Sequence, residues 1–140
     1  EGSPIHVHSE YQDVIELADG SLVVCGAHIR LNYDTVNFSG LYSVYGVITK
    51  YSASGDSIWS RNYTHPENVQ SQLSVHSLLS IVQTDDGGFA AGGWLLPNPP
   101  DTGTHDTWVI KVDSFGCLIP GCEVVGVPKI QSPIASLKVY

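Results

Sequence analysis

The side chains best suited to chemistry in this sequence are its histidines, its cysteines and a few clustered carboxylates. His6 and His8 alternate on one face of an expected strand, a spacing that can chelate a metal ion. No third ligand accompanies them, so we expect solvent-facing histidines and no metal site. Carboxylates gather in the string TDDGG, Thr84 to Gly88, which lacks the Asp-x-Asp-x-Asp-Gly spacing of a calcium loop. We expect these acids to cap turns.

The three cysteines divide into a close pair and a single residue. Cys117 and Cys122 bracket Leu-Ile-Pro-Gly, a turn-forming insert that can bring their Cα atoms within the reach of a disulfide. We predict a disulfide there. The alternatives are two reduced thiols or half of a metal site, and no second cysteine pair completes a zinc set. Cys25 lies in an apolar run, where we expect a buried and inert thiol.

Catalytic signatures and charge patterns narrow the function further. The sequence has no Gly-x-Ser-x-Gly elbow, and nothing singles out a carboxylate pair for glycoside hydrolysis. We therefore expect no enzyme activity and no cofactor. Six Lys and Arg stand against fourteen Asp and Glu, and the net charge of −8 opposes binding to nucleic acid or to anionic lipid. No apolar run reaches the roughly 18 residues of a membrane span.

The strands that must position these residues are predicted from an internal repeat in the sequence. Copy one contains YQDVIELADGSLVVCGA, Tyr11 to Ala27, and copy two contains LSIVQTDDGGFAAGGW, Leu79 to Trp94, at an offset of 67. A second part follows in each copy: YGVITKYSASGDSIW, Tyr45 to Trp59, and DTWVIKVDSFGCLIP, Asp106 to Pro120, at an offset of 61. The difference in offset places a loop between the two parts.

Each copy is predicted to form four antiparallel strands, a to d, with tight hairpins between a and b and between c and d. The largely apolar strands indicate a sheet covered on both faces. We therefore predict an all-β fold made of two four-stranded blades of a β-propeller, with a two-sheet β-sandwich as the alternative. The string VHS also occurs twice, at Val7 and at Val75, with an offset of 68. Either one copy carries a β-bulge in strand a or this match is chance.

The strings SIVQTDDGGFAAGGW and DTWVIKVDSFG resemble repeats of secreted, propeller-like proteins of Bacteroidota. Those repeats have a TsDGGyiiaG hairpin followed by D-x-W-[VIL]-[IV]-K-[LV]-D-x-x-G. Copy one departs from the pattern, with Tyr45 and Val47 in place of Asp and Trp, and Ser52 in place of the second Asp. The resemblance covers about residues 10–120. It implies a fold but no particular activity, because the shared positions are turn glycines and core residues.

The C-terminal segment carries a second resemblance. SPIASLKVY, Ser132 to Tyr140, is similar to the start of the C-terminal sorting domain of type IX secretion. The resemblance implies a protein secreted to the medium or the cell surface. We accordingly divide the chain into a two-blade segment at 1–125 and a linker with the start of a sorting region at 126–140. Propeller rings need about four to eight blades. We expect the missing blades in a longer precursor or in other copies of this chain.

The functional prediction rests on the side of the blades that carries the long connections. These are His28 to Val44, Leu95 to His105 and Tyr63 to Ser74, and long loops in a compact domain are uncommon unless functional. We expect glycan or protein to be bound there, through Tyr33, Phe38, Tyr42, Trp94 and His105. The sequence thus favours a non-catalytic extracellular binding or scaffold module. The alternatives are an accessory propeller of a secreted hydrolase and a self-assembling structural subunit.

Overall fold

The computed structural model describes residues 7–34, 39–65, 75–96 and 104–122, and these ranges form an all-β fold, as predicted. Hydrogen bonds join the strands in one seven-stranded sheet of order β1-β2-β3-β5-β6-β7, with β4 paired to β3 beside this path. The predicted linker and sorting region at 126–140 lie outside the described residues. The strands are β1 (Val7–Glu16), β2 (Leu22–Asp34), β3 (Ser39–Tyr51), β4 (Ser57–Tyr63), β5 (Val75–Gln83), β6 (Phe89–Leu96) and β7 (Asp106–Val112).

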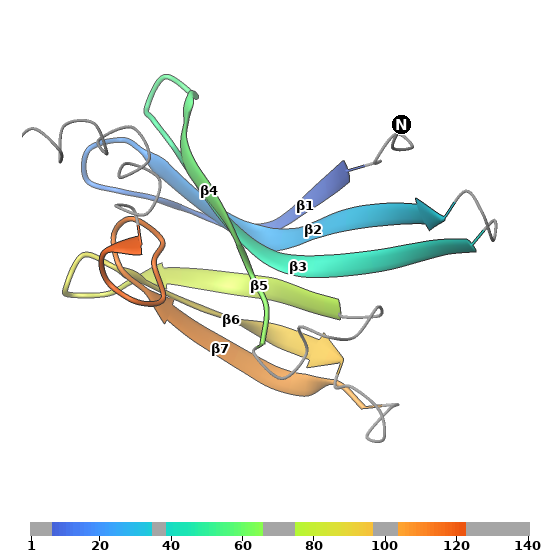
Figure 1. The fold of residues 1–140 in the computed structure, drawn as a ribbon. Coiled ribbons are helices and arrows are strands. Elements are labelled where there is room, and N and C mark those ends of the chain that lie inside the picture. The colour runs from blue at the N-terminus through green and yellow to red at the C-terminus, as the bar shows by residue number, and fades with distance from the viewer. Residues whose placement is uncertain (1–6, 35–38, 66–74, 97–103, 123–140) are drawn as a thin grey trace, which may run out of the picture.

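The sheet divides into two antiparallel groups that correspond to the two copies of the repeat. β1 to β4 form copy one and β5 to β7 form copy two. Figure 1 shows the two groups as separate layers, with β4 crossing in front of them. One parallel backbone pair, Val44 with Val75, connects β3 to β5. Most of the contact between the copies must therefore come from side chains.

The four tight turns that follow β1, β3, β5 and β7 share one hydrogen-bond pattern. In each, the first residue accepts a hydrogen bond from the N–H three residues on, and its own N–H bonds to the carbonyl four residues on. The residue three positions after the first is always a glycine with φ between 76° and 93°, a conformation that side chains with a Cβ rarely adopt. This is a type I turn closed by a glycine bulge. The turns begin at Leu17, Ser52, Thr84 and Asp113.

Strand a carries a β-bulge in both copies, at equivalent positions. The register shifts between Tyr11 and Asp13 in β1 and between Leu78 and Ser80 in β5, 67 residues apart. Because both copies have the bulge, it does not explain the offset of 68 between the two VHS strings, and His8 and His76 are not equivalent. A glycine faces each bulge, Gly26 or Gly93, because a Cβ there would run into the bulged strand's backbone.

The bulge glycines give a direct test of this packing. A Cβ on Gly93 would overlap the carbonyl oxygen of Ser77, whereas a Cβ on Gly92 would meet no atom within 4 Å. We expect Gly93→Ala to lower the free energy of unfolding by about 1–3 kcal/mol through overpacking. Gly92→Ala should change it by less than about 0.5 kcal/mol. Urea unfolding of the two variants would measure both values, and equal losses would contradict the assignment of the bulge.

The fourth strand predicted for copy two is not formed in the described residues. β7 ends at Val112, the turn at Asp113 follows, and the chain to Cys122 contains no strand. Pro120 falls where copy one has Trp59 in β4 and has no N–H for a ladder hydrogen bond. Gly121 then turns the chain with a φ of 94°. A disulfide joins Cys117 to Cys122 across this loop, with the two Cα atoms 5.5 Å apart.

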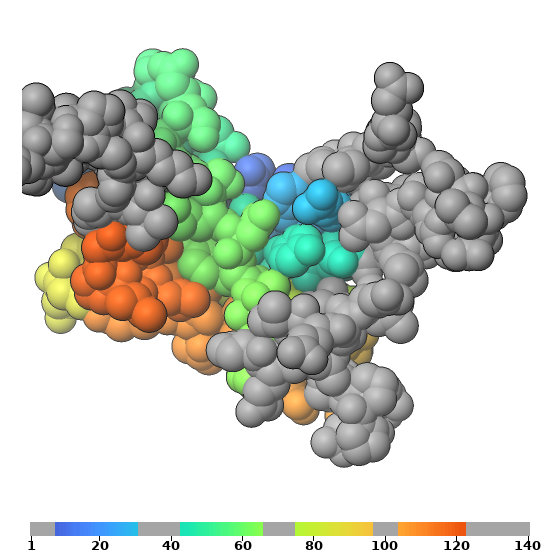
Figure 2. Space-filling model, viewed as in Figure 1, coloured from blue at the N-terminus to red at the C-terminus, as the bar shows by residue number. Residues whose placement is uncertain are grey.

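β4 of copy one fastens the disulfide loop to the rest of the molecule. The hydroxyl of Tyr63 donates to the carbonyl oxygen of Gly116 at 2.8 Å, and Arg61 Nε donates to that of Phe115 at 2.9 Å. Trp59 packs on Phe89, with ring centroids 6.3 Å apart. Figure 2 shows β4 in green as a band between the blue-green surface of copy one and the orange surface of copy two.

The core lies between the copies and uses unlike faces of them. Copy one contributes Val23, Cys25 and Ile48, all fully buried. The repeat-equivalent positions of copy two do not face the core. Copy two packs the opposite face of its strands into the core. In copy one, the residues at the repeat positions equivalent to that opposite face are mostly exposed or half-buried. The core residues contributed by copy two are Leu78, Ile81, Phe89, Ala91, Leu95, Trp108, Ile110 and Val112.

Candidate functional site

The predicted binding end of the molecule lies opposite the tight turns. Figure 1 places the last residues of β2 and β6 and the first residues of β3 and β7 at one end, and the β1–β2 and β5–β6 turns at the other. Tyr33 lies in β2 opposite Gly40, and Tyr42 lies in β3 opposite Leu31. Phe38 lies outside the described residues. Trp94 is in β6, and His105 immediately precedes β7.

The long loop predicted from His28 to Val44 is wrong for most of its length. β2 and β3 stay paired as far as Asp34 and Ser39, so only the four residues between them connect the strands. The signal was present in the sequence, since Ile29, Leu31 and Tyr33 alternate with polar residues at the period of a strand. The feature at this end of copy one is therefore a long hairpin.

Trp94 and His105 form an aromatic pair at this end of copy two. Their ring centroids are 4.5 Å apart and the rings are inclined at 74°, an edge-to-face arrangement. Trp94 is half-buried and His105 is exposed. In copy one, Ala27 and Val44 occupy the equivalent positions. The pair is thus a feature of copy two that the shared scaffold does not require.

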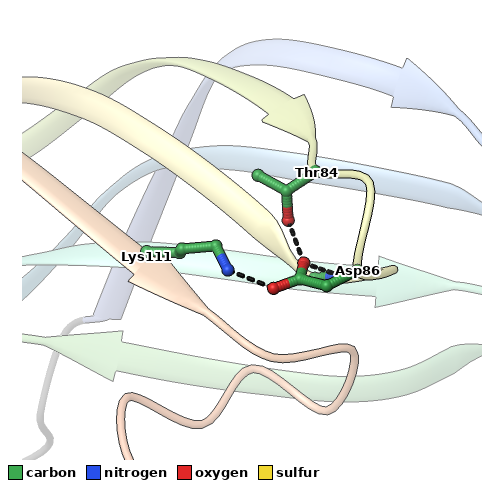
Figure 3. Close-up of polar contacts among 4 residues, drawn as sticks. Thr84, Asp86 and Lys111 are labelled. Atoms are coloured by element: carbon green, nitrogen blue, oxygen red, sulfur yellow. Dashed lines mark hydrogen bonds and ion pairs between the residues drawn. The ribbon is translucent and has the colours of Figure 1, made fainter.

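The acidic string TDDGG has a structural role at the opposite end. The carboxylate of Asp86 accepts hydrogen bonds from the N–H of Gly88 and the hydroxyl of Thr84, and it forms an ion pair with Lys111. Figure 3 shows Thr84 and Lys111 reaching the two oxygens of this carboxylate. These contacts, the Lys111 bond first, hold the pKa of Asp86 well below its usual range. The acids cap turns here, as expected from the sequence.

A carboxylate also caps the corresponding turn of copy one, with different hydrogen-bond donors. The carboxylate of Asp19 accepts from the N–H and the hydroxyl of Ser21. Its pKa is lowered mainly by these bonds, with a smaller contribution from the charge of Lys50. Asp113 caps the second turn of copy two by accepting from the N–H groups of Phe115 and Cys117. The Asp positions of the repeat thus stabilise turns, and in copy two Lys111 adds an ion pair.

A hollow of about 410 Å³ lies beside the Asp86–Lys111 ion pair and is lined in part by Asp113, Ser114 and Pro120. Both of its carboxylates accept hydrogen bonds from turn N–H groups, and its lysine is paired with Asp86. The charged groups that could serve as acid or base are therefore already engaged in structural contacts. Among the described residues, no group of three His, Cys, Asp or Glu side chains is placed to hold a metal ion.

Cys25 lies at the centre of the core and is fully buried, with its thiol free. Burial, aided by the nearby charge of Asp13, raises its pKa to about 12. A thiol with this pKa carries almost no thiolate at neutral pH, so it is a poor nucleophile. The expectation of a buried cysteine is confirmed.

Within the described residues, no helix is long and apolar enough to cross a membrane.

Compared with models of known protein families, with curated proteins and with solved structures, the chain gives no match.

His76 is the one buried histidine among the described residues, and sequence reasoning did not single it out as functional. Its Nε2 accepts the N–H of His65 at 3.0 Å, and its Nδ1 lies 3.3 Å from the carbonyl oxygen of Val44. Its ring meets that of Trp108 edge-on, with centroids 5.0 Å apart. Burial lowers the pKa of His76, against the opposing effect of the Val44 carbonyl. The neutral ring is thus part of the junction between β3 and β5.

The buried His76 should make stability depend on pH. Its folded-state pKa lies below the ordinary value of about 6.5, so its contribution is complete above that pH. As the pH falls below about 6.5, the unfolded chain binds a proton that the folded chain resists, and stability decreases. We expect the free energy of unfolding to be lower at pH 5.5 than at pH 7.5.

The test compares this loss in the native chain and in His76→Gln, whose amide can make both hydrogen bonds without titrating. The variant should lose less stability between the two pH values. His8→Gln, at an exposed position, is the matched control and should keep the native dependence. An unchanged dependence in His76→Gln would assign the effect to other groups.

Proposed function

We propose that this chain is a non-catalytic binding or scaffold module that contacts a glycan or a protein at the end bearing the β2–β3 and β6–β7 connections. The observation that best supports this proposal is the edge-to-face pair of Trp94 and His105. The copy-one equivalents are Ala27 and Val44, so the fold can be built without this pair. Aromatic rings at such a position suit contact with sugar or with protein side chains.

The geometry of the pair supports this role. His105 is exposed and Trp94 is half-buried between its strand neighbours Ser77 and Thr107, so the indole is held while part of it stays accessible. A ring held in place loses little conformational entropy when a ligand docks. By contrast, the carboxylates and the lysine beside the turn-end hollow already bond to the protein itself. The loop end is therefore the better candidate for ligand contact.

We further propose that the two copies are blades of a β-propeller in an exported protein. A closed two-sheet sandwich would show polar outer faces. Here the outer faces carry exposed Val14 on copy one and exposed Val82 and Val109 on copy two. The packing of unlike faces also suits a series of stacked blades. The Cys117–Cys122 disulfide fits an oxidising compartment, and the C-terminal resemblance to a type IX sorting domain supports export.

Binding can be tested with a glycan array and with a panel of extracellular proteins. We expect a ligand whose affinity falls at least about tenfold in Trp94→Ala, equivalent to about 1.4 kcal/mol, with a smaller loss in His105→Ala. Phe115→Ala is the matched control, because Phe115 is an exposed aromatic at the opposite, turn end. Its affinity should match that of the native chain. Ligand binding that survives both loop-end substitutions would refute the proposed site.

A further inference from the structure

Among the described residues, the two repeat units form one interface, and parts of the two faces that would form an equivalent interface are exposed. In the existing interface, the copy-one face that includes Val23, Cys25 and Ile48 packs on the copy-two face that includes Ile81 and Phe89. Each unit uses a different face. The copy-two equivalent of the first face is exposed at Val109. The copy-one equivalent of the second face is exposed in β1 and β2, whereas its β3 positions Val47 and Thr49 are buried within the chain.

The open face of copy two is apolar and accessible. Ile48 is 0% exposed, and its equivalent Val109 is 68% exposed. Cys25 is fully buried, and at its equivalent, Gly92, an added Cβ would meet no atom within 4 Å. We call this surface the leading face. It consists of Val82, Ala90, Gly92 and Val109, the equivalents of Ile15, Val23, Cys25 and Ile48.

The open face of copy one has the complementary character. Ile81 is 2% exposed in copy two, whereas its equivalent Val14 is 54% exposed. Leu78 and Phe89 are also buried, and their equivalents Tyr11 and Leu22 are exposed. We call this surface the trailing face. It consists of Tyr11, Val14, Leu22 and Val24, the equivalents of Leu78, Ile81, Phe89 and Ala91.

We propose that the leading face of one chain docks on the trailing face of a second copy of the same chain, repeating between molecules the contact that already joins the two repeats. The occupant follows from the internal repeat, because the surface that covers Val23 and Ile48 within the chain has its equivalent on the chain's own copy one. The contact is head-to-tail, so each docked chain offers a further leading face. With two units per chain, a ring of about four to eight blades would need about two to four chains.

This inference rests on the packing between repeats and not on the ligand proposed for Trp94 and His105. Trp94 lies on the same side of β6 as Ala90 and Gly92, so a docked second copy and a ligand at Trp94 would compete for one surface. Its test is the mass of the full 140-residue chain in solution, by sedimentation velocity and native mass spectrometry from micromolar to near-millimolar concentration. We expect assemblies that are multiples of the 15.1 kDa chain and that grow with concentration. A 15.1 kDa monomer throughout this range would overturn the proposal.

Charged substitutions on each face test its head-to-tail character. Val109→Asp on the leading face and Val14→Asp on the trailing face should each shift the chain to monomer, because each removes one half of every junction. An equimolar mixture of the two variants should form a one-to-one pair and nothing larger, since one intact leading face and one intact trailing face remain. Assembly that persists in either variant, or a mixture that stays monomeric, would overturn the proposal.

Two further variants keep this result interpretable. Ile58→Asp introduces the same charge at an exposed position in β4 outside both faces and should assemble as the native chain does. Val82→Asp provides a second leading-face variant if Val109→Asp loses its cooperative thermal transition. Glycan or protein binding measured on the monomeric variants separates this proposal from the proposed function, because the Trp94–His105 pair is intact in all of them.

Discussion

The packing of unlike faces between the two repeats is the interaction on which the rest of the structure depends. Between the copies the backbone supplies the parallel pair of Val44 and Val75, so side chains must hold the layers together. Burial of apolar side chains supplies most of the free energy that holds the layers together, at about 25 cal/mol for each Å² of apolar surface removed from water. Polar contacts fix the register: Asp13 of β1 accepts the N–H of Ile81 and the hydroxyl of Ser80 in β5. These bonds, the Ile81 N–H first, lower the pKa of Asp13.

The two copies share a set of residues because the backbone has the same few requirements in each. Each tight turn needs a glycine at positive φ, and each bulge in strand a needs a glycine opposite it, such as Gly26 or Gly93. The carboxylates of Asp19 and Asp86 then satisfy N–H groups within their turns. None of these roles involves a ligand. The positions that identify the repeat therefore say how the chain folds and little about what it binds, which directs attention to residues such as Trp94 that differ between the copies.

Turn chemistry and short-range periodicity made the strands and hairpins predictable from sequence, and the close spacing of Cys117 and Cys122 suggested their disulfide. The strand expected after Asp113 is not formed in the described residues. The turn at Asp113 predicts a hairpin, but Pro120 has no N–H to donate to a strand ladder. The chain after His28 forms a strand pair instead of the expected loop, because Ile29, Leu31 and Tyr33 alternate with polar residues at the period of a strand. His76 could not have been recognised, since its burial depends on Val44, His65 and Trp108, which lie far from it in sequence.

The junction inferred between chains should be weaker than the one within the chain, for reasons visible in the residues themselves. Where copy one presents Val23 and Cys25, the leading face presents Ala90 and Gly92, which bury less apolar surface. Where copy one presents the carboxylate of Asp13, copy two has Ser80. A hydroxyl makes a neutral hydrogen bond worth about 0.5–1.5 kcal/mol, against about 1.5–3 kcal/mol for a charged one. In the proposed assembly, a permanent junction within each chain would be combined with a reversible one between chains, so assembly would respond to concentration while each chain stays folded.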